Sequence, residues 1–250
     1  MENPRGPQKS LCELPVPRIR SYVLRSRMTP AQKKTHAAFP DSGALIPAGE
    51  ESSAPLDLPA LFPFPCEKYI VEIGFGMGKA LALMAQENPA AGYVGVEVHT
   101  PGVARLLWEI ENRGLKNVRI IHGDAAIAVR RLSAASTDAF HIFFPDPWPK
   151  KRHNKRRLLS PDFLRLLSSR LVAGGYQYII TDWEDYAAQV KEALAEVPDL
   201  RVVPDPCGLA PWRPETAFEK KGRDAGRSIC EIFCVKINAS ATKKIANDER

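Results

Sequence analysis

The residues best suited to chemistry lie in one stretch, 143–157, which reads F-F-P-D-P-W-P-K-K-R-H-N-K-R-R. Asp146 and Trp148 stand between prolines, which fix φ and cannot donate backbone hydrogen bonds, so a rigid turn follows a strand here. Six cations come next: Lys150, Lys151, Arg152, Lys155, Arg156 and Arg157. A carboxylate and an aromatic ring beside a cationic run suit a flat base attached to phosphates. The alternative is a capped strand end followed by a solvated charge run.

A glycine-rich turn at 72–78, E-I-G-F-G-M-G, forms a second candidate site. Its glycines are Gly74, Gly76 and Gly78. A dinucleotide fingerprint would place a further glycine where this chain has Lys79. Glu72, on the strand before the turn, would repel a pyrophosphate. The turn therefore suits a cationic ligand better than a dinucleotide.

Acidic residues end two further predicted strands. Glu97 ends the second strand, where a carboxylate would bind ribose hydroxyls. Asp124 ends the third and is placed to accept from an adenine amino group. This order is typical of S-adenosylmethionine binding, because a carboxylate ~5 Å from the cationic sulfonium contributes roughly 3 kcal/mol before desolvation. The alternative is that Glu97 and Asp124 cap helices.

Strand and helix patterns alternate along the rest of the chain. Strands are predicted at 69–73, 93–98, 118–122, 139–144, 176–181, 200–203 and 229–237, and helices at 79–88, 100–113, 125–132, 160–171 and 185–196. This alternation predicts an α/β fold with a seven-stranded, mostly parallel sheet and helices on both faces. Ligands of such sheets bind outside the carboxyl ends of the strands, where all the candidate residues fall.

Composition limits the class of protein. The net charge of +6 over 250 residues favours an anionic partner. The cysteines form no metal-binding spacing, so we expect a reduced compartment and no metal. No apolar run approaches the ~18 residues of a membrane helix, and the N-terminus lacks a secretory h-region. A cytoplasmic protein without membrane contact is expected, as a monomer or a homodimer.

Three regions are predicted: a Pro-rich, partly disordered arm at 1–66, a main domain at 67–238, and a polar tail at 239–250. The arm has little periodicity, so we expect it to be dispensable for folding up to about Pro59. Its cations around Tyr22 suggest a second nucleic-acid contact, with a solvated tail as the alternative. Within the main domain, Trp108 lies on a helical apolar stripe and is predicted to be core.

Five segments together carry a resemblance to a known family. They are V-E-I-G-F-G-M-G, G-V-E-V-H-T-P-G, F-P-D-P-W-P-K-K-R-H-N-K-R-R-L, T-D-W-E-D-Y-A and R-P-E-T-A-F-E-K-K-G. The chain resembles the single-chain, bacterial-type tRNA (guanine-N7-)-methyltransferase family over roughly 68–237. The resemblance implies a class I methyltransferase, Rossmann-like fold. It also implies methyl transfer from S-adenosylmethionine to N7 of a guanosine in the tRNA variable loop, position 46 in tRNA numbering, to form 7-methylguanosine.

The resemblance also implies roles for individual residues. Glu72, Glu97, Asp124 and Asp146 match the cofactor site, with the glycine turn, and Asp146 matches the proposed catalytic residue. The matching substrate contacts are Lys150, Asp182, Thr216, Ala217, Phe218 and Glu219. The matching RNA-contacting loop is Arg152, His153, Asn154, Lys155, Arg156 and Arg157. Ala217 departs from the family, where a lysine is expected, and the long N-terminal arm has no counterpart.

The reaction explains why acids would be needed here. Guanine N7 carries a free lone pair, so no general base has to deprotonate it, and the enzyme has only to orient the guanine and stabilise its new charge. Asp146, Asp182 and Glu219 are placed to accept from guanine N1-H and its amino group. Alternatively, Asp182 caps a helix and Glu219 pairs with Lys220 or Arg223. Rival functions are a methyltransferase for another substrate and an RNA-binding module without turnover.

Overall fold

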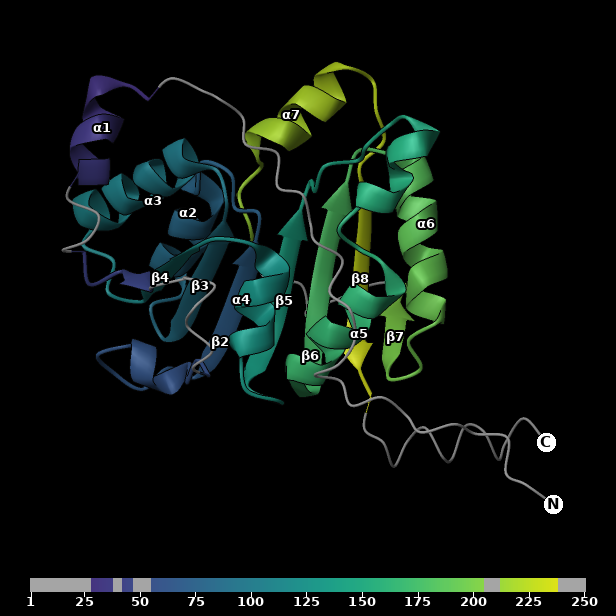
Figure 1. The fold of residues 1–250 in the computed structure, drawn as a ribbon, viewed down its shortest axis with the longest axis horizontal. Helices are drawn as coiled ribbons and strands as arrows, with labels where there is room; N and C mark the ends of the chain where they lie inside the picture. The colour runs from purple at the N-terminus through teal and green to yellow at the C-terminus, as the bar shows by residue number, and fades with distance from the viewer. Residues whose placement is uncertain (1–27, 38–41, 47–54, 205–211, 238–250) are drawn as a thin grey trace.

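The computed structural model describes residues 28–37, 42–46, 55–204 and 212–237. One sheet runs through these residues in the order β1-β4-β3-β2-β5-β6-β8-β7. Its strands are β1 (Leu45–Ile46), β2 (Lys68–Ile73), β3 (Ala91–Glu97), β4 (Val118–His122), β5 (Thr137–Phe143), β6 (Leu171–Thr181), β7 (Leu200–Val203) and β8 (Cys230–Lys236). All neighbours pair in parallel except β8, which is antiparallel to both β6 and β7 (Figure 1).

Helices cover both faces of this sheet. They are α1 (Pro30–Ala37), α2 (Lys79–Glu87), α3 (Thr100–Arg113), α4 (Ala125–Arg131), α5 (Pro161–Arg170), α6 (Glu184–Ala195) and α7 (Ala217–Asp224), with 3-10 turns η2 (Pro59–Leu61) and η3 (Lys151–Arg156). Helices α2 and α3 pack on one face and α4, α5 and α6 on the other. The predicted α/β fold, mostly parallel and covered on both faces, is confirmed.

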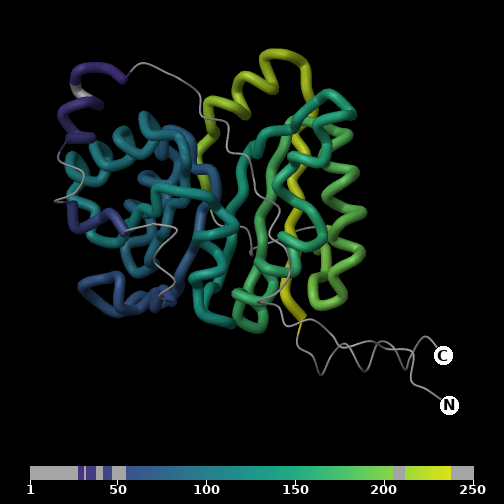
Figure 2. The backbone as a smooth tube through the Cα atoms, in the orientation of Figure 1, coloured from purple at the N-terminus to yellow at the C-terminus, as the bar shows by residue number. Residues whose placement is uncertain are grey.

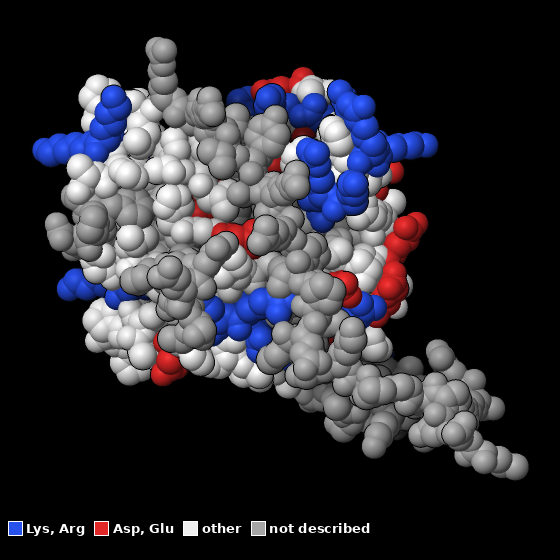
Figure 3. Space-filling model, in the orientation of Figure 1, with Lys and Arg blue, Asp and Glu red and all other residues white. Residues whose placement is uncertain are grey.

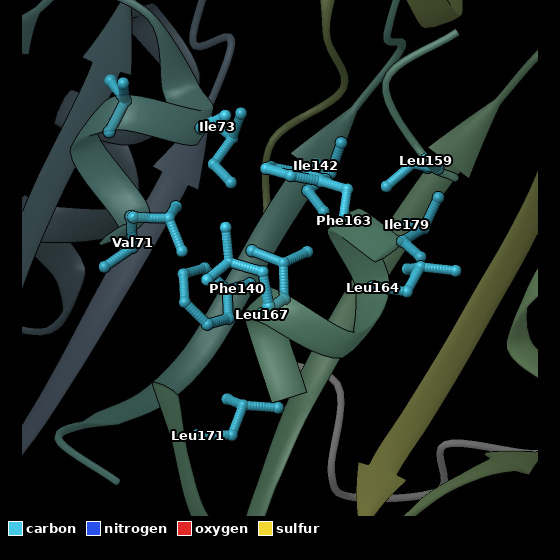
Figure 4. Close-up of a cluster of buried hydrophobic side chains, with 14 of the residues drawn as sticks. Val71, Ile73, Phe140, Ile142, Leu159, Phe163, Leu164, Leu167, Leu171 and Ile179 are labelled. Atoms are coloured by element: carbon cyan, nitrogen blue, oxygen red, sulfur yellow. The ribbon is translucent and has the colours of Figure 1, made fainter. Parts of the chain in front are cut away.

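Alternating side chains of the central strands supply the two cores. Val71 and Ile73 on β2 and Phe140 and Ile142 on β5 point toward α5, where they meet its Leu167 (Figure 4). Ile70 on β2 and Ala139 and Phe143 on β5 belong to the other core, with the apolar residues of α2 and α3. Both faces of the strands are apolar because helices bury both, as expected for a parallel sheet. The exceptions on these strands are Glu72 and His141, which are buried and polar.

The order of strands reverses beside β2, which pairs with β3 on one side and with β5 on the other. In doubly wound sheets this reversal opens a crevice at the carboxyl ends of the strands. The glycine turn follows β2 there, Glu97 ends β3, and the loop with Asp146 follows β5. The topology therefore brings three of the candidate segments to one edge of the sheet.

Part of the predicted arm belongs to the folded core. Strand β1 adds an eighth, two-residue strand to the predicted seven by pairing with β4. Leu56 and Leu58 are buried at 5% and 0% exposure, and the Leu56 amide donates to the Arg131 carbonyl at 2.6 Å. This packing argues against the expectation that residues up to about Pro59 are dispensable for folding. That expectation relied on the lack of a helical period, but an extended segment buries alternate residues without one.

Helix α1 lies beside α3 (Figure 2). Thr29 and Gln32 form a capping box at its start, since each side chain accepts from the other's backbone amide at 3.2 and 2.8 Å. The Gln32 side chain also donates to the Pro101 carbonyl on α3 at 3.3 Å. Of the cations grouped with Tyr22, Lys33 and Lys34 are exposed on α1, whereas Arg18, Arg20, Arg25 and Arg27 lie outside the described residues, as does the tail from 239.

Trp108 on α3 is more exposed than predicted. Its side chain is 39% exposed, and the Arg105 guanidinium lies 4.3 Å from the centre of its ring. The apolar stripe of α3 instead consists of residues such as Val103, Leu106 and Leu107. Trp108 lies at the edge of this stripe, so the prediction that it is core was wrong.

Leu58→Ala is expected to lower the free energy of unfolding by about 2–4 kcal/mol, because a fully buried leucine leaves a cavity. Urea unfolding measures this change. Asp57→Ala is the matched control, since Asp57 is exposed and should unfold like the parent. Equal stability of the two variants would show that this segment contributes nothing to the core.

Candidate functional site

The glycine turn after β2 is held by Glu97. The Gly76 amide donates to Glu97 Oε2 at 2.8 Å, and the amides of Val98 and His99 donate to Oε1 at 2.7 and 2.9 Å. The start of α3 also packs on the turn, because a Cβ at Gly102 would lie 2.0 Å from the Gly76 carbonyl oxygen. Gly76 itself has φ +58°, in the left-handed region that favours glycine. Glu97, which is predicted to bind the ribose, therefore also holds the glycine turn in place.

Asp124 caps helix α4. Its Oδ1 accepts from the amides of Ala126 and Ile127 at 2.8 and 3.3 Å. The capping alternative is therefore confirmed for Asp124. A role toward adenine stays a prediction, since a carboxylate can accept more than two hydrogen bonds.

Glu72 is buried, with 3% exposure, and its Oε2 has no hydrogen-bond partner among the described residues. Its neighbours in the sheet are Gly95, which has no side chain, and His141, which is also buried. Burial, reinforced by the negative charge of Glu97, raises the pKa of Glu72 to about 8. A buried carboxyl whose Oε2 has no partner among the described residues, next to the glycine turn, is suited to bind a ligand. A cationic or amine-bearing ligand fits it.

The loop after β5 is strained as well as rigid. Phe144 and Trp148 both have positive φ, at +53° and +45°, and each precedes a proline. Such backbone costs of order 1–3 kcal/mol per residue and persists only where surrounding contacts enforce it. Asp146 lies between them with an exposed side chain, yet the atoms around it desolvate the carboxyl and raise its pKa. The predicted catalytic carboxylate is thus held out toward solvent on a fixed loop.

Arg157 holds this loop and is not a surface cation. Its guanidinium is buried and donates to the Pro147 carbonyl at 2.8 Å, to Gln189 Oε1 at 2.6 Å and to Asp185 Oδ2 at 2.5 Å. It also lies 4.9 Å from the ring centre of Tyr186. This burial argues against the predicted contact between Arg157 and RNA, which stays a prediction. Its hydrogen bonds connect the loop with α6.

The other basic residues of the run do face solvent. Lys150, Lys151, Arg152, Lys155 and Arg156 are exposed along η3. Lys and Arg side chains gather over this segment at the upper right of the molecule (Figure 3). The Arg156 guanidinium lies 5.0 Å from the ring centre of Trp148, and His153 meets that ring edge-on at 5.8 Å. Asn154 differs, since its Oδ1 is buried without a partner among the described residues.

Helix α7 brings the last group of predicted residues over the same edge of the sheet (Figure 1). Thr216 caps it by accepting from the Glu219 amide at 3.0 Å, and Ala217 is its first residue. Phe218 is 59% exposed and stacks on Phe144, with ring centres 6.4 Å apart. Phe218 also lies 3.8 Å from where a Cβ at Gly76 would be. The glycine turn, the loop after β5 and α7 therefore meet at Phe218.

The two remaining acids are both paired with arginines. Asp182 Oδ2 accepts from Arg227 Nε at 2.8 Å, where the sequence left a helix-cap role open. Glu219 is buried and bound by Arg213 and by Arg223, the latter at 2.8 Å. Burial alone would raise the pKa of Glu219, but the hydrogen bonds and charges of both arginines outweigh burial and lower it. Glu219 is therefore not a surface acid, although its predicted pairing with Arg223 is present.

Sequence reasoning missed α7 and Arg213. The signal for the helix is Thr216-x-x-Glu219, a capping-box spacing that starts a helix. Arg213 had no signal of its own, because nothing in the local pattern shows that only 10% of this arginine's side chain is exposed.

Comparison with known proteins agrees with this geometry. Residues 67–232 match a family model described as "Putative methyltransferase". A tRNA (guanine-N(7)-)-methyltransferase of Treponema pallidum is 49% identical over 179 residues, 71% of this chain and 70% of the relative. One from Nitrosococcus oceani is 42% identical over 217 residues, 86% of this chain and 89% of the relative. The chain belongs to the tRNA (guanine-N7-)-methyltransferase family.

The fold of this family member is shared with more distant enzymes. The crystal structure of the aminoglycoside resistance methyltransferase NpmB1 superposes with a TM-score of 0.50 at 14% identity. The match covers 69% of this chain and 88% of that one. It confirms the predicted methyltransferase fold. Within the described ranges, no helix could cross a membrane, and no group of three or more His, Cys, Asp or Glu residues could hold a metal ion.

Glu72 is expected to make the stability of the ligand-free protein fall as the pH rises. Its pKa of about 8 in the folded state exceeds the ordinary value of 4.5, so between these values the folded protein binds the extra proton. The stabilisation is complete below the lower value and is lost as pH rises through the higher one, at up to ~1.4 kcal/mol per pH unit.

Glu72→Gln should remove this pH dependence between about pH 5 and pH 8, as measured by urea unfolding across that range. Glu87→Gln, at the exposed end of α2, is the matched control and should keep the parent's slope. A Glu72→Gln variant with the parent's slope would show that Glu72 is already ionised in the folded protein.

Proposed function

We propose that this protein transfers a methyl group from S-adenosylmethionine to N7 of guanosine 46 in the tRNA variable loop. The observation that carries the proposal is one edge of the sheet, where Glu72, the Glu97-bound glycine turn and the Asp146 loop meet beside an exposed cationic run. The names of the relatives support the substrate. Such a reaction belongs where tRNA is found, which we propose is the cytoplasm.

The cofactor residues fit a cationic ligand. S-adenosylmethionine supplies an activated methyl group on a sulfonium centre. Glu72 would provide a buried carboxylate for this charge, and Glu97 lies at the end of β3, where ribose hydroxyls would bind. Asp124 would accept from the adenine amino group. Because the pKa of Glu72 is raised to about 8, binding of a cation is expected to release its proton.

The guanine must be oriented, because its N7 lone pair needs no deprotonation. Asp146 and Asp182 are proposed to accept from N1-H and the exocyclic amino group, which fixes the base and offsets the positive charge that arrives on it. Phe218 and Phe144 provide an apolar ring pair beside this position. Lys150 begins the cationic segment that would bind the phosphates. At Ala217, where the family is expected to have a lysine, one contact to the substrate would be lost.

The rival hypothesis is a methyltransferase for another substrate. A test is incorporation of labelled methyl from the cofactor into a tRNA transcript. A matched transcript carries 7-deazaguanosine at position 46, which lacks the N7 lone pair but keeps the other edges of the base. Methylation of the first transcript alone supports the proposal. Equal labelling of both would place the methyl group elsewhere, and labelling of neither would favour another substrate.

Asp146→Asn is expected to slow single-turnover methyl transfer by ~100- to 1000-fold at saturating tRNA and cofactor, because a donor group replaces one acceptor oxygen and the counter-charge is removed. The affinity for tRNA should change little, because phosphates supply most of it. Asp162→Asn is the control, since Asp162 is a half-exposed acid on α5. If Asp146→Asn transfers methyl at close to the parent's rate, Asp146 is not the catalytic residue and Asp182 becomes the candidate.

The exposed and buried cations of the run should behave differently toward RNA. Neutralising Arg152, Lys155 and Arg156 should reduce the log–log salt slope of tRNA binding by roughly 0.7–0.9 for each phosphate that is no longer neutralised. Arg157→Met should leave this slope unchanged, but it should destabilise the fold by ~1–3 kcal/mol because it removes hydrogen bonds from a charged group. A lower slope in Arg157→Met, without a loss of stability, would restore Arg157 as an RNA contact.

A further inference from the structure

Arg213 occupies an unusual place just before α7. Its side chain is 10% exposed and donates to Glu219 on α7, to Glu231 on β8 at 3.1 Å, and to the Tyr178 hydroxyl on β6 at 3.3 Å. The guanidinium also lies 5.7 Å from the ring centre of Phe143, at the end of β5. One cation therefore joins α7 to three strands. None of the proposed cofactor or substrate roles uses it.

The pairing with Glu219 decides what that acid can do. Arg213 Nη1 donates to Oε2 and Nη2 to Oε1, while Arg223 donates to Oε1 as well. Both carboxylate oxygens are thus bound by guanidinium groups within a buried environment. Removing one partner of such a pair leaves an uncompensated buried charge. The arrangement suits an anchor for α7 better than a direct acceptor for guanine.

The position of α7 in turn places other residues of the site. Phe218, next to Glu219 in the chain, lies over Gly76 and stacks on Phe144. One turn later, α7 comes so close to Asp182 that a Cβ at Gly222 would lie 3.1 Å from Asp182 Oδ2. A shift of α7 would therefore move the aromatic platform and the contact with Asp182 together.

We infer that Arg213 is a positioning residue of the methyltransferase site, which acts through Glu219 to hold α7 and Phe218 over the glycine turn and the loop after β5. The inference rests on the proposed function for its kinetic consequences. Its structural consequence, the docking of α7, is independent of the substrate. Misplacement of reacting groups by about 1 Å can reduce a rate ~100-fold, so removal of this anchor should act on turnover.

Arg213→Met tests this role, because methionine keeps apolar contact with the rings but carries no charge. The turnover number should fall roughly 10- to 100-fold, while the KM for tRNA stays within about 3-fold. Arg213→Lys, which keeps the charge without the planar fork, should recover part of the rate. Arg165→Met is the matched control, since Arg165 also binds two acids, Asp162 and Glu196, but on α5. It should turn over like the parent.

Hydrogen exchange gives a readout that needs no activity. In Arg213→Met, the amides of 217–224 should lose protection while those of β2 to β6 keep it. Unchanged protection of α7 would overturn the inference even if the rate fell. Loss of protection throughout the sheet would also overturn it, because Arg213 would then be a residue of global stability. If the parent protein does not methylate tRNA, the proposed function is refuted. The hydrogen-exchange result would still test whether Arg213 holds α7.

A double-mutant cycle separates anchoring from direct recognition by Glu219. If Arg213 acts through Glu219, the variant with both Arg213→Met and Glu219→Met should be no slower than the slower single variant. If the two effects multiply, Glu219 contacts the substrate independently and the inference fails.

Discussion

The position of the loop after β5 depends on one buried guanidinium. Three prolines make this loop stiff, but stiffness alone does not place it relative to the sheet. Arg157 does so by donating to the Pro147 carbonyl from one side and to Gln189 and Asp185 of α6 from the other. Burying an arginine is costly unless its donors are bound. The bonds that satisfy Arg157 are the same bonds that hold Asp146, one residue away from Pro147, at the edge of the sheet.

The acids of the site differ because their surroundings differ. Glu97 is bound by three backbone amides and stabilises the turn, whereas Glu72 has an oxygen without a partner among the described residues and a raised pKa. Asp124 caps a helix, and Asp146 is exposed on a strained loop. Carboxylates whose bonds are complete hold the structure, and those whose bonds are incomplete are suited to a ligand. By this distinction, Glu72 and Asp146 are the acids best placed for the proposed contacts with cofactor and base.

Much of the fold could be predicted from the sequence, because apolar runs such as 69–73 and 118–122 are typical of strands buried on both faces. The edge of the sheet that carries the site followed from that alternation. The sequence could not show that Leu56 and Leu58 pack in the core, since an extended segment has no helical period to detect. Nor could it distinguish Arg157 from Arg156, or place Trp108 at the edge of its apolar stripe, because burial of one side chain depends on distant elements.

The cationic run shows how local geometry divides one stretch of sequence between two tasks. Lys151 to Arg156 form the 3-10 turn η3, which presents most of its long side chains to solvent. Arg157 follows as its C-cap with extended backbone, at φ −60° and ψ 134°, so the chain changes direction there. Its side chain turns back to the loop that precedes η3, where it binds the Pro147 carbonyl. A polyanion at this surface would therefore meet Lys150 and the exposed cations of η3, while the adjacent Arg157 binds the loop that carries Asp146. Arg156, which would contact RNA, and Arg157, which holds the loop of Asp146, are therefore adjacent in the chain.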